Sequence, residues 1–260
     1  MTSKIIKMRT VLITGASSGI GAACAQVLAT ESNYRLLLCA RRADRLTSLT
    51  KEIHILHPNV DIHSFTLDVR DNAEVKKAIA SLPPEWQNID VLINNAGLSQ
   101  GLDALQDGDT DDWDRMIDTN VKGLLYVSKA VIPLLKKSQR AHIINIGSIA
   151  GKEVYPNGNV YCATKHAVDA LNKAMRIDLL PFGIKVTAVN PGMVETEFSE
   201  VRFKGDKERA KNVYTGVTPL SGTDIAETIS FVLSRPAHVN INDLLIMPTA
   251  QATGTVIVRN

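Results

Sequence analysis

The sequence predicts an α/β fold in which short buried strands alternate with helices along all 260 residues. The first observation is a β-rich run at residues 11–13, which leads through a glycine-rich turn into a small-residue helical pattern over 22–30 and a second apolar strand over 34–40. The second observation is that this alternation repeats through the rest of the chain. Alternation of this kind is typical of a parallel sheet with helices on both faces.

The later elements follow in the same order. Apolar runs predict further strands at 60–67, 89–93, 141–147, 184–189 and 243–247. Helical patterns separate them over 71–82, 112–137, 158–180 and 223–234. No repeat, low-complexity tract or linker divides the sequence, so we expect one domain over residues 1–260. The tail that follows residue 247 shows no clear partner within the chain.

Composition and charge argue against several classes of protein. Hydrophobic residues make up 45% and charged residues 22%, and the net charge of +2 gives no reason to expect a nucleic-acid or membrane partner. No apolar run reaches the roughly 18–20 residues of a membrane-spanning helix, and glycines soon interrupt the apolar stretch after Lys4 and Lys7, which argues against a secretory signal peptide. The cysteines show no CxxC spacing and the histidines no metal-ligand spacing. We therefore expect a cytoplasmic protein without a metal site.

The glycine-rich turn at residues 14–21 (TGASSGIG) is the first candidate binding site. Glycines allow the backbone to approach a ligand closely, and the N–H groups at the start of the following helix are free to bind a pyrophosphate. The alternative is a strand-to-helix turn that binds nothing. Because the turn lies in a βαβ unit, dinucleotide binding is favoured.

The end of the second strand indicates which dinucleotide is bound. An acidic residue about 20 residues after the glycines is typical of NAD, because it binds the ribose 2′-hydroxyl. Here Arg41 and Arg42 occupy that place, and two guanidinium groups suit a 2′-phosphate. The sequence therefore favours NADP, although two solvated arginines are the alternative. We interpret Asp44 as a first-turn helix residue.

Three further strand ends are candidate cofactor contacts. Asp68 and Val69 follow the third strand, where an adenine would lie in a doubly wound sheet. Residues 94–97 (NNAG) follow the fourth strand and either pin loops together or contact the cofactor ribose. Residues 190–198 (NPGMVETEF) follow the sixth strand and form a turn whose backbone could flank a nicotinamide.

Tyr161 and Lys165 are the candidate acid–base pair. They are four residues apart on a predicted helix, which places them on one face about 6 Å apart. A nearby ammonium group favours an ionised phenol, so we expect the pKa of Tyr161 to fall below its usual value of about 10. Ser148, at the end of the fifth strand, is a candidate hydrogen-bond donor to a substrate oxygen. The YxxxK pattern alone is common, and an ordinary helix surface is the alternative.

Two other features are less specific. Asn120 lies inside a predicted helix, and its spacing alone favours a side chain that faces water over one that distorts the helix and holds a relay water. Residues 201–207 (VRFKGDK) are too polar for a core. They indicate a lid or substrate segment near residues 195–220.

In combination, these motifs resemble the short-chain dehydrogenase/reductase family. The pattern consists of residues 14–21, residues 94–97, Asn120, Ser148, Tyr161 with Lys165, and residues 191–192, in the family's order and spacing. The resemblance covers nearly the whole chain. It implies a single-domain Rossmann fold with a doubly wound seven-stranded parallel sheet, a nicotinamide cofactor and usually a homotetramer.

A narrower resemblance appears in the second half of the chain. Residues 158–161 (GNVY), 196–198 (TEF), 201–206 (VRFKGD) and 236–242 (PAHVNIN) are similar to NADP-dependent 3-hydroxy acid dehydrogenases, which oxidise serine, allo-threonine and related β-hydroxy acids. The bacterial members carry extra glycines between Val194 and Thr196, where this chain has a single Glu195. This resemblance implies an oxidoreductase that transfers a hydride between NADP(H) and a 3-hydroxy acid or the matching carbonyl compound.

The family resemblance also implies roles for individual residues. Ser148 would hold the substrate oxygen, Tyr161 would exchange the proton, and Lys165 would lower the Tyr161 pKa and bind the nicotinamide ribose. For Asn120 the resemblance reverses the expectation from spacing, because the family uses this residue to position a relay water. The residues expected to bind the cofactor are Gly15, Ser17, Ser18, Gly19, Ile20, Gly21, Arg41, Arg42, Asp68, Val69, Asn95, Gly97, Tyr161, Lys165, Pro191, Gly192, Val194 and Thr196.

An acid substrate needs a cation near Ser148 and Tyr161. We hypothesise that Arg202 or Lys204 reaches the substrate carboxylate when the charged segment closes; a solvated lid face is the alternative. A broad NADPH-dependent carbonyl reductase is the competing enzymatic function, since the same catalytic residues would serve it. An NADP-binding sensor without turnover is disfavoured, because Asn120, Ser148, Tyr161 and Lys165 are all present.

Overall fold

A seven-stranded sheet forms the centre of the computed structural model, which describes residues 8–260; Lys4 and Lys7 lie outside the described residues. The strand order is β3-β2-β1-β4-β5-β6-β9, and every neighbouring pair is parallel. The strands are β1 (Arg9–Thr14), β2 (Tyr34–Ala40), β3 (Ile62–Thr66), β4 (Val91–Asn94), β5 (His142–Ile146), β6 (Lys185–Pro191) and β9 (Asp243–Ile246). The predicted doubly wound parallel sheet is therefore confirmed.

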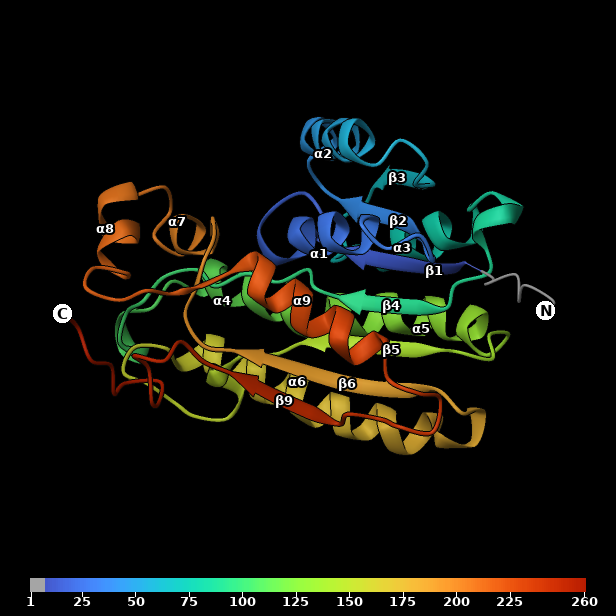
Figure 1. The fold of residues 1–260 in the computed structure, drawn as a ribbon. Helices are drawn as coiled ribbons and strands as arrows, with labels where there is room; N and C mark the ends of the chain where they lie inside the picture. Colours follow the sequence, from blue (N-terminus) through green and yellow to red (C-terminus); the bar gives the residue numbers. More distant parts are fainter. Residues whose placement is uncertain (1–7) are drawn as a thin grey trace.

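Helices cover both faces of this sheet (Figure 1). The helices on one face are α1 (Gly19–Ala29), α2 (Ala43–Leu56) and α9 (Gly222–Leu233). Those on the other are α3 (Asn72–Ala80), α5 (Leu124–Leu135) and α6 (Asn159–Leu179). Leu36, Leu37 and Leu38 are each fully buried, because the side chains of a central strand point alternately into the two apolar layers.

The strand order reverses between β1 and β4. From β1 the chain runs outward through β2 and β3, and it then returns to β4 on the other side of β1. The loops that leave β1 and β4 consequently diverge above the carboxyl ends of these strands. In open parallel sheets such a reversal produces the crevice in which ligands bind.

The helix expected over 112–137 is interrupted. It consists of α4 (Thr110–Ile117), a π-helical turn η3 (Asp118–Gly123) and α5. A π turn inserts an extra residue into a helix and is often found at functional sites. Here the turn carries Asn120, which is 2% exposed, so the expectation that its side chain faces water is wrong.

Residues 194–221, called the 194–221 segment below, form a separate structure over the carboxyl ends of the strands (Figure 1). Two short parallel strands, β7 (Val194–Glu195) and β8 (Leu220–Ser221), join its ends. Between them lie α7 (Phe198–Arg202) and α8 (Lys207–Asn212). The segment therefore has its own local structure, which hydrophobic periodicity does not reveal because these elements are so short.

The C-terminal tail packs against the 194–221 segment. The guanidinium group of Arg259 donates to the carbonyl oxygens of Val213 and Thr215, and the Asn260 N–H donates to the carbonyl oxygen of Gly216. The expectation that the tail has no partner is therefore wrong. These contacts are mostly to backbone atoms, which leave no signature in the side-chain pattern. Over residues 8–260, the helices lack the combination of length and apolar character needed to cross a bilayer.

Candidate active site

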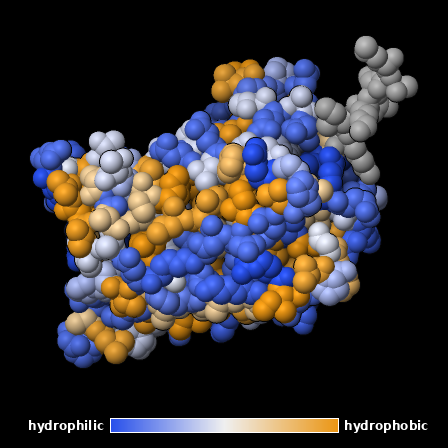
Figure 2. Space-filling model, turned by 60° about the horizontal axis from the view of Figure 1, so that its bottom comes forward, coloured by the Kyte–Doolittle hydropathy of each residue, from blue (hydrophilic) through white to orange (hydrophobic). Residues whose placement is uncertain are grey.

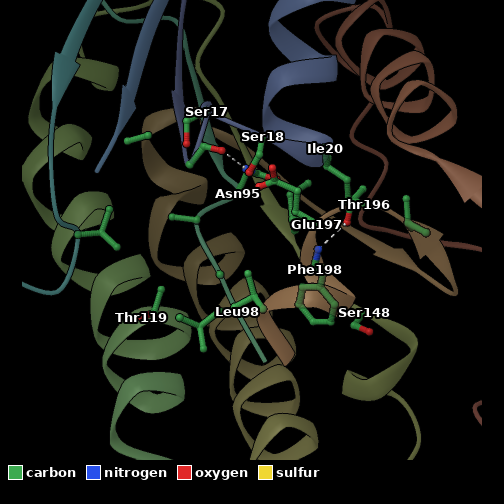
Figure 3. A pocket seen from close by; sticks show the side chains of 18 of the residues that line it. Ser17, Ser18, Ile20, Asn95, Leu98, Thr119, Ser148, Thr196, Glu197 and Phe198 are labelled. Atoms are coloured by element: carbon green, nitrogen blue, oxygen red, sulfur yellow. Dashed lines mark hydrogen bonds between the residues drawn. The ribbon is translucent and has the colours of Figure 1, made fainter. Parts of the chain in front are cut away.

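A cavity of about 310 Å³ opens at the reversal point of the sheet (Figure 3). It brings together most residues expected to bind the cofactor: Gly15, Ser17, Ser18, Ile20, Arg41, Arg42, Asp68, Val69, Asn95, Gly97, Tyr161, Lys165, Pro191, Gly192, Val194 and Thr196. Ser148 lines the same cavity. Gly19, Gly21, Asn120 and Arg202 lie outside this lining.

The glycines of the turn have distinct structural roles. Gly15 has a φ of +66°, a conformation that glycine adopts without steric cost. A Cβ on Gly21 would lie 2.4 Å from Asn95 Nδ2 and 2.5 Å from the Gly15 carbonyl oxygen, so only glycine fits there. Gly21 thus allows the turn to pack closely against Asn95 without lining the cavity, whereas Gly15 lines the cavity.

Asn95 holds the turn in place. Its side-chain amide donates to the carbonyl oxygens of Thr14 and Gly15, and its backbone N–H donates to the Thr14 hydroxyl oxygen. Of the two alternatives for residues 94–97, the structure therefore bears out the pinning of loops. Asn95 also lines the cavity, so a contact with the cofactor ribose stays a prediction.

The turn and α1 fit the phosphates of a dinucleotide. Ser18 precedes α1 in an extended conformation, and its side chain makes no capping bond to the helix within the described residues. The first N–H groups of α1 are thus available to an anion, and the helix dipole favours negative charge there. Arg42 lies beside this turn, where its guanidinium group donates to the hydroxyl oxygens of Ser17 (3.4 Å) and Ser18 (2.7 Å).

Asp68, which follows β3, lines the cavity close to Arg41. Asp68 forms a bidentate ion pair with Arg70. Burial raises the pKa of the Asp68 carboxyl, but the hydrogen bonds from Arg70 outweigh it and the pKa is lowered overall. The carboxylate is therefore ionised at neutral pH, next to the exposed Arg41.

Ser148, Tyr161 and Lys165 lie together on the floor of the cavity. Ser148 follows β5 and begins a short 3-10 turn, η4 (Ile149–Gly151), whereas the other two extend from α6. Their exposed fractions are 9%, 8% and 7%. The Lys165 ammonium lies 6.0 Å from the centre of the Tyr161 ring, as its helical spacing predicts, and donates to the Ile146 carbonyl oxygen at 2.9 Å.

The pKa of Tyr161 is shifted opposite to the expectation from sequence. Burial raises it, the Tyr155 hydroxyl adds to this, and Arg202 and a hydrogen bond with Ser148 only partly oppose it. Burial also lowers the pKa of Lys165 to about 8. The prediction of a lowered phenol pKa in the protein alone is wrong, because the cost of placing a charge in this site exceeds the effect of the nearby cation.

Asn120 holds the loop that follows β4. Its side-chain oxygen accepts a bond of 2.8 Å from the Leu98 N–H, and its amide donates to the Leu98 carbonyl oxygen and to the Thr164 hydroxyl. These bonds link the π turn to the cavity wall and to α6. They occupy the amide group itself, and the positioning of a relay water stays a prediction.

Arg202 and Lys204, the two basic residues of the 194–221 segment that could bind a substrate carboxylate, lie in different surroundings. Lys204 forms ion pairs with Asp109 (3.1 Å) and Asp112 (2.9 Å), outside the cavity. The guanidinium carbon of Arg202 lies 5.2 Å from the centre of the Tyr161 ring. Arg202 is thus next to the candidate acid–base residue, and Lys204 anchors the segment.

Two residues that the sequence did not identify hold Arg202. Its Nε donates to the Ser99 hydroxyl at 3.1 Å, and its terminal nitrogen donates to the Tyr155 hydroxyl at 2.9 Å. Phe198 packs on Tyr161 with their ring centres 5.6 Å apart. Phe198 belongs to the stretch 196–198 described above, but only the fold shows that it meets Tyr161.

The family of the chain follows from comparison with known proteins. The model of the short chain dehydrogenase family matches residues 9–207. The chain belongs to the short-chain dehydrogenase family. This membership confirms the predicted family and agrees with the geometry of Ser148, Tyr161 and Lys165.

Individual members of the family are similar over nearly their whole length. An NADP-dependent 3-hydroxy acid dehydrogenase of Schizosaccharomyces pombe is 43% identical over 251 residues, which cover 96% of this chain and 96% of that protein. Sulfoacetaldehyde reductase 2 of Chromohalobacter salexigens is 45% identical over 93% of this chain and 95% of that protein. The closed form of a serine dehydrogenase complexed with NADP+ superimposes with a TM-score of 0.90 at 40% identity, covering 96% of this chain and 99% of the other.

Proposed function

We propose that this short-chain dehydrogenase transfers a hydride between NADP(H) and a 3-hydroxy acid, or the corresponding carbonyl compound. The observation that carries the proposal is the guanidinium group of Arg202, which lies 5.2 Å from the ring of Tyr161. The names of the two dehydrogenases described above agree with this substrate class and with NADP.

The cofactor would bind along the cavity described above. The N-terminus of α1 would hold the pyrophosphate, and Arg41 with Arg42, Ser17 and Ser18 would hold the 2′-phosphate. When bound, NADP(H) accepts or supplies the hydride. Asp68, Val69 and the backbone of residues 191–196 would border its adenine and nicotinamide ends.

The proton would move through Tyr161. The raised pKa of Tyr161 keeps its phenol protonated at neutral pH. The hydroxyl would therefore act as the proton donor to a carbonyl oxygen of the substrate. Ser148 would hold the same oxygen through its hydroxyl. Lys165 lies beside the phenol and is charged below pH about 8, which stabilises the phenolate that remains after the proton has left.

Arg202 would bind the carboxylate of the substrate. Ser99 and Tyr155 hold the guanidinium group, so little side-chain entropy is lost on binding. We infer that the 194–221 segment acts as the substrate lid, since α7 packs Phe198 on the Tyr161 ring and holds the guanidinium carbon of Arg202 5.2 Å from the centre of that ring. Lys204, paired with two aspartates, would not contact substrate.

The test is a panel of initial rates with NADP and NAD against β-hydroxy acids and plain alcohols of matched length. We expect NADP and the acids to be preferred. Arg202→Ala should raise KM for a hydroxy acid by about 10- to 100-fold, since hydrogen bonds to charged groups contribute about 1.5–3 kcal/mol, and should change rates with a neutral alcohol far less. Equal losses on both substrates would support the broad carbonyl reductase instead.

We further propose a cytoplasmic homotetramer. Apolar side chains are exposed on a helix that covers one face of the sheet and on its edge strand, with Phe231 of α9 and Leu245 of β9 each 50% exposed. Figure 2 shows apolar residues among polar ones over one face of the molecule. The outer edge of β9 also offers unpaired backbone groups. Light scattering on the purified protein tests this; a monomer at micromolar concentration would contradict it.

A further inference from the structure

Glu197 links the 194–221 segment to the arginines of the cofactor site. Its carboxylate accepts hydrogen bonds from Arg42 at 3.0 Å and from Arg45, which lie at the N-terminal end of α2. Figure 3 shows Glu197 close to Ser17 and Ser18, the two serines that also bind Arg42. Glu197 therefore uses the same guanidinium group that would hold a 2′-phosphate.

The charge on Glu197 is maintained by its partners. Burial raises the pKa of the Glu197 carboxyl, but the hydrogen bonds from Arg45 and Arg42 outweigh it, and the pKa is lowered overall. The side chains of Arg42, Arg45 and Glu197 are 41%, 45% and 36% exposed to solvent, so water and an incoming anion can both reach these three residues. A 2′-phosphate bound there would lie beside an ionised carboxylate.

The same residue fixes one end of α7. Glu197 immediately precedes this helix, and Arg202 ends it five residues later. Five helical residues span about 7.5 Å, so the ion pair at one end and the guanidinium group over Tyr161 at the other belong to one short rigid unit. Phe198, the first residue of α7, packs on the Tyr161 ring. The position of Arg202 thus depends on where Glu197 is held.

We propose that Glu197 is a specificity-determining and positioning residue: it shares Arg42 with the 2′-phosphate of the cofactor and holds α7 over Tyr161. The positioning part rests on the proposed function, whereas the competition with the phosphate does not require any substrate. Removal of the Glu197 charge therefore has two opposite effects. It strengthens binding of the phosphorylated cofactor by removing a like charge, and it weakens substrate binding by releasing α7.

The experiment compares Glu197→Gln with the wild-type protein by fluorescence titration of NADPH and NADH without substrate. We expect the Kd of NADPH to fall by about three- to tenfold. This is the change in affinity expected when the repulsion between one unit charge and a dianion, several ångströms apart in a partly aqueous medium, is removed. The Kd of NADH should stay within about twofold, because NADH carries no 2′-phosphate at which the Coulomb repulsion would act.

Glu200→Gln is the matched control. Glu200 lies on α7 and is exposed, so this change removes the same charge from the same helix while the bonds to Arg42 and Arg45 remain. It should leave both dissociation constants unchanged. If Glu197→Gln shifts NADPH and NADH equally, or if Glu200→Gln reproduces its effect, the competition is overturned.

Steady-state kinetics test the positioning role. Glu197→Gln should raise KM for a hydroxy acid while kcat changes less, and the KM increases of Glu197→Gln and Arg202→Ala should not multiply in the double variant, because both act through α7. Multiplying effects would overturn the positioning role. If no hydroxy acid is turned over at all, the proposed function fails, and the cofactor titrations still decide the competition.

Discussion

The floor of the cavity and the 194–221 segment that faces it are held by different interactions. Ser148, Tyr161 and Lys165 are at most 9% exposed, and the Tyr161 ring belongs to an apolar cluster with Leu98 and Met116. The 194–221 segment is held in part by ion pairs at the surface: Glu197 with the arginines, and Lys204 with the half-exposed Asp109 and the buried Asp112.

This difference has consequences for stability and for motion. Burial of apolar area gives a floor that is insensitive to salt, whereas exposed ion pairs are weakened by it. The candidate reacting groups are therefore held by burial, whereas the segment opposite them is held in part by contacts that salt weakens. The following changes test that division, beginning with the largest expected effect.

Tyr161→Phe removes the phenol hydroxyl, which is the candidate proton donor and is also hydrogen-bonded to Ser148. We expect kcat to fall by about 100- to 10,000-fold, the range of general acid–base catalysis. NADPH binding, measured by fluorescence titration, should be unchanged, since the ring still packs on Phe198. A variant with comparable turnover would remove Tyr161 from the mechanism.

Lys165→Met tests the cost of the buried charge. The folded-state pKa of about 8 lies below the ordinary value of 10.5, so between these pH values the unfolded chain binds more protons and the free energy of unfolding rises with pH. The rise is at most about 3–4 kcal/mol for this one group, since one pKa unit corresponds to about 1.4 kcal/mol.

Urea denaturation at pH 7.5 and pH 10 measures this contribution. The free energy of unfolding of Lys165→Met should not rise between these two pH values, and at pH 7.5 it should exceed that of the wild type. The variant should also lose activity. Lys173→Met, which removes an exposed lysine from the same helix, should keep the rise. An unchanged pH dependence in Lys165→Met would show that folding does not lower the pKa of Lys165.

Arg42→Ala moves the test to the cofactor end of the cavity. It removes the donor to Ser17, Ser18 and Glu197, and we expect the Kd of NADPH to rise about 10- to 100-fold, since charged hydrogen bonds contribute about 1.5–3 kcal/mol. The Kd of NADH should change little. Equal weakening of both cofactors would mean that Arg42 supports the loop without binding the phosphate.

Lys204→Ala should have the smallest effect. Its ammonium group and the Asp109 carboxylate are half exposed, whereas the Asp112 carboxylate is buried, and ion pairs that reach into solvent are screened by salt. We expect KM for a hydroxy acid to rise no more than about fivefold at low salt, with the difference vanishing in 1 M salt, where the Debye length is about 3 Å. Lys207→Ala is the control on the same segment. A salt-independent effect would show that Lys204 contacts the substrate directly.

Much of the fold and of the site was predictable from sequence, for identifiable reasons. The strand at 34–40 was located to the residue, because a strand buried on both faces reads as a continuous apolar run. The spacing of Tyr161 and Lys165 fixed their common face. Nearly all residues expected at the cofactor line one cavity, since the carboxyl ends of parallel strands converge at one edge of the sheet.

Other features depend on contacts between distant residues. The π turn at Asn120 arises where its amide bonds Leu98 and Thr164, and helical periodicity does not register it. The pKa of Tyr161 rises because the fold buries the phenol, which no spacing rule reports. The separation of Arg202 from Lys204 depends on which acidic or aromatic groups lie opposite each side chain.

The sequence by itself determined the order of strands and helices, the residue types of the candidate catalytic site and the preference for a phosphorylated cofactor, because these follow from local patterns and residue types. Only the tertiary structure decided how strongly each group is charged and which residue of the 194–221 segment meets the cofactor arginines. Those properties depend on burial and on pairs such as Arg42 and Glu197, which are 155 residues apart in the chain.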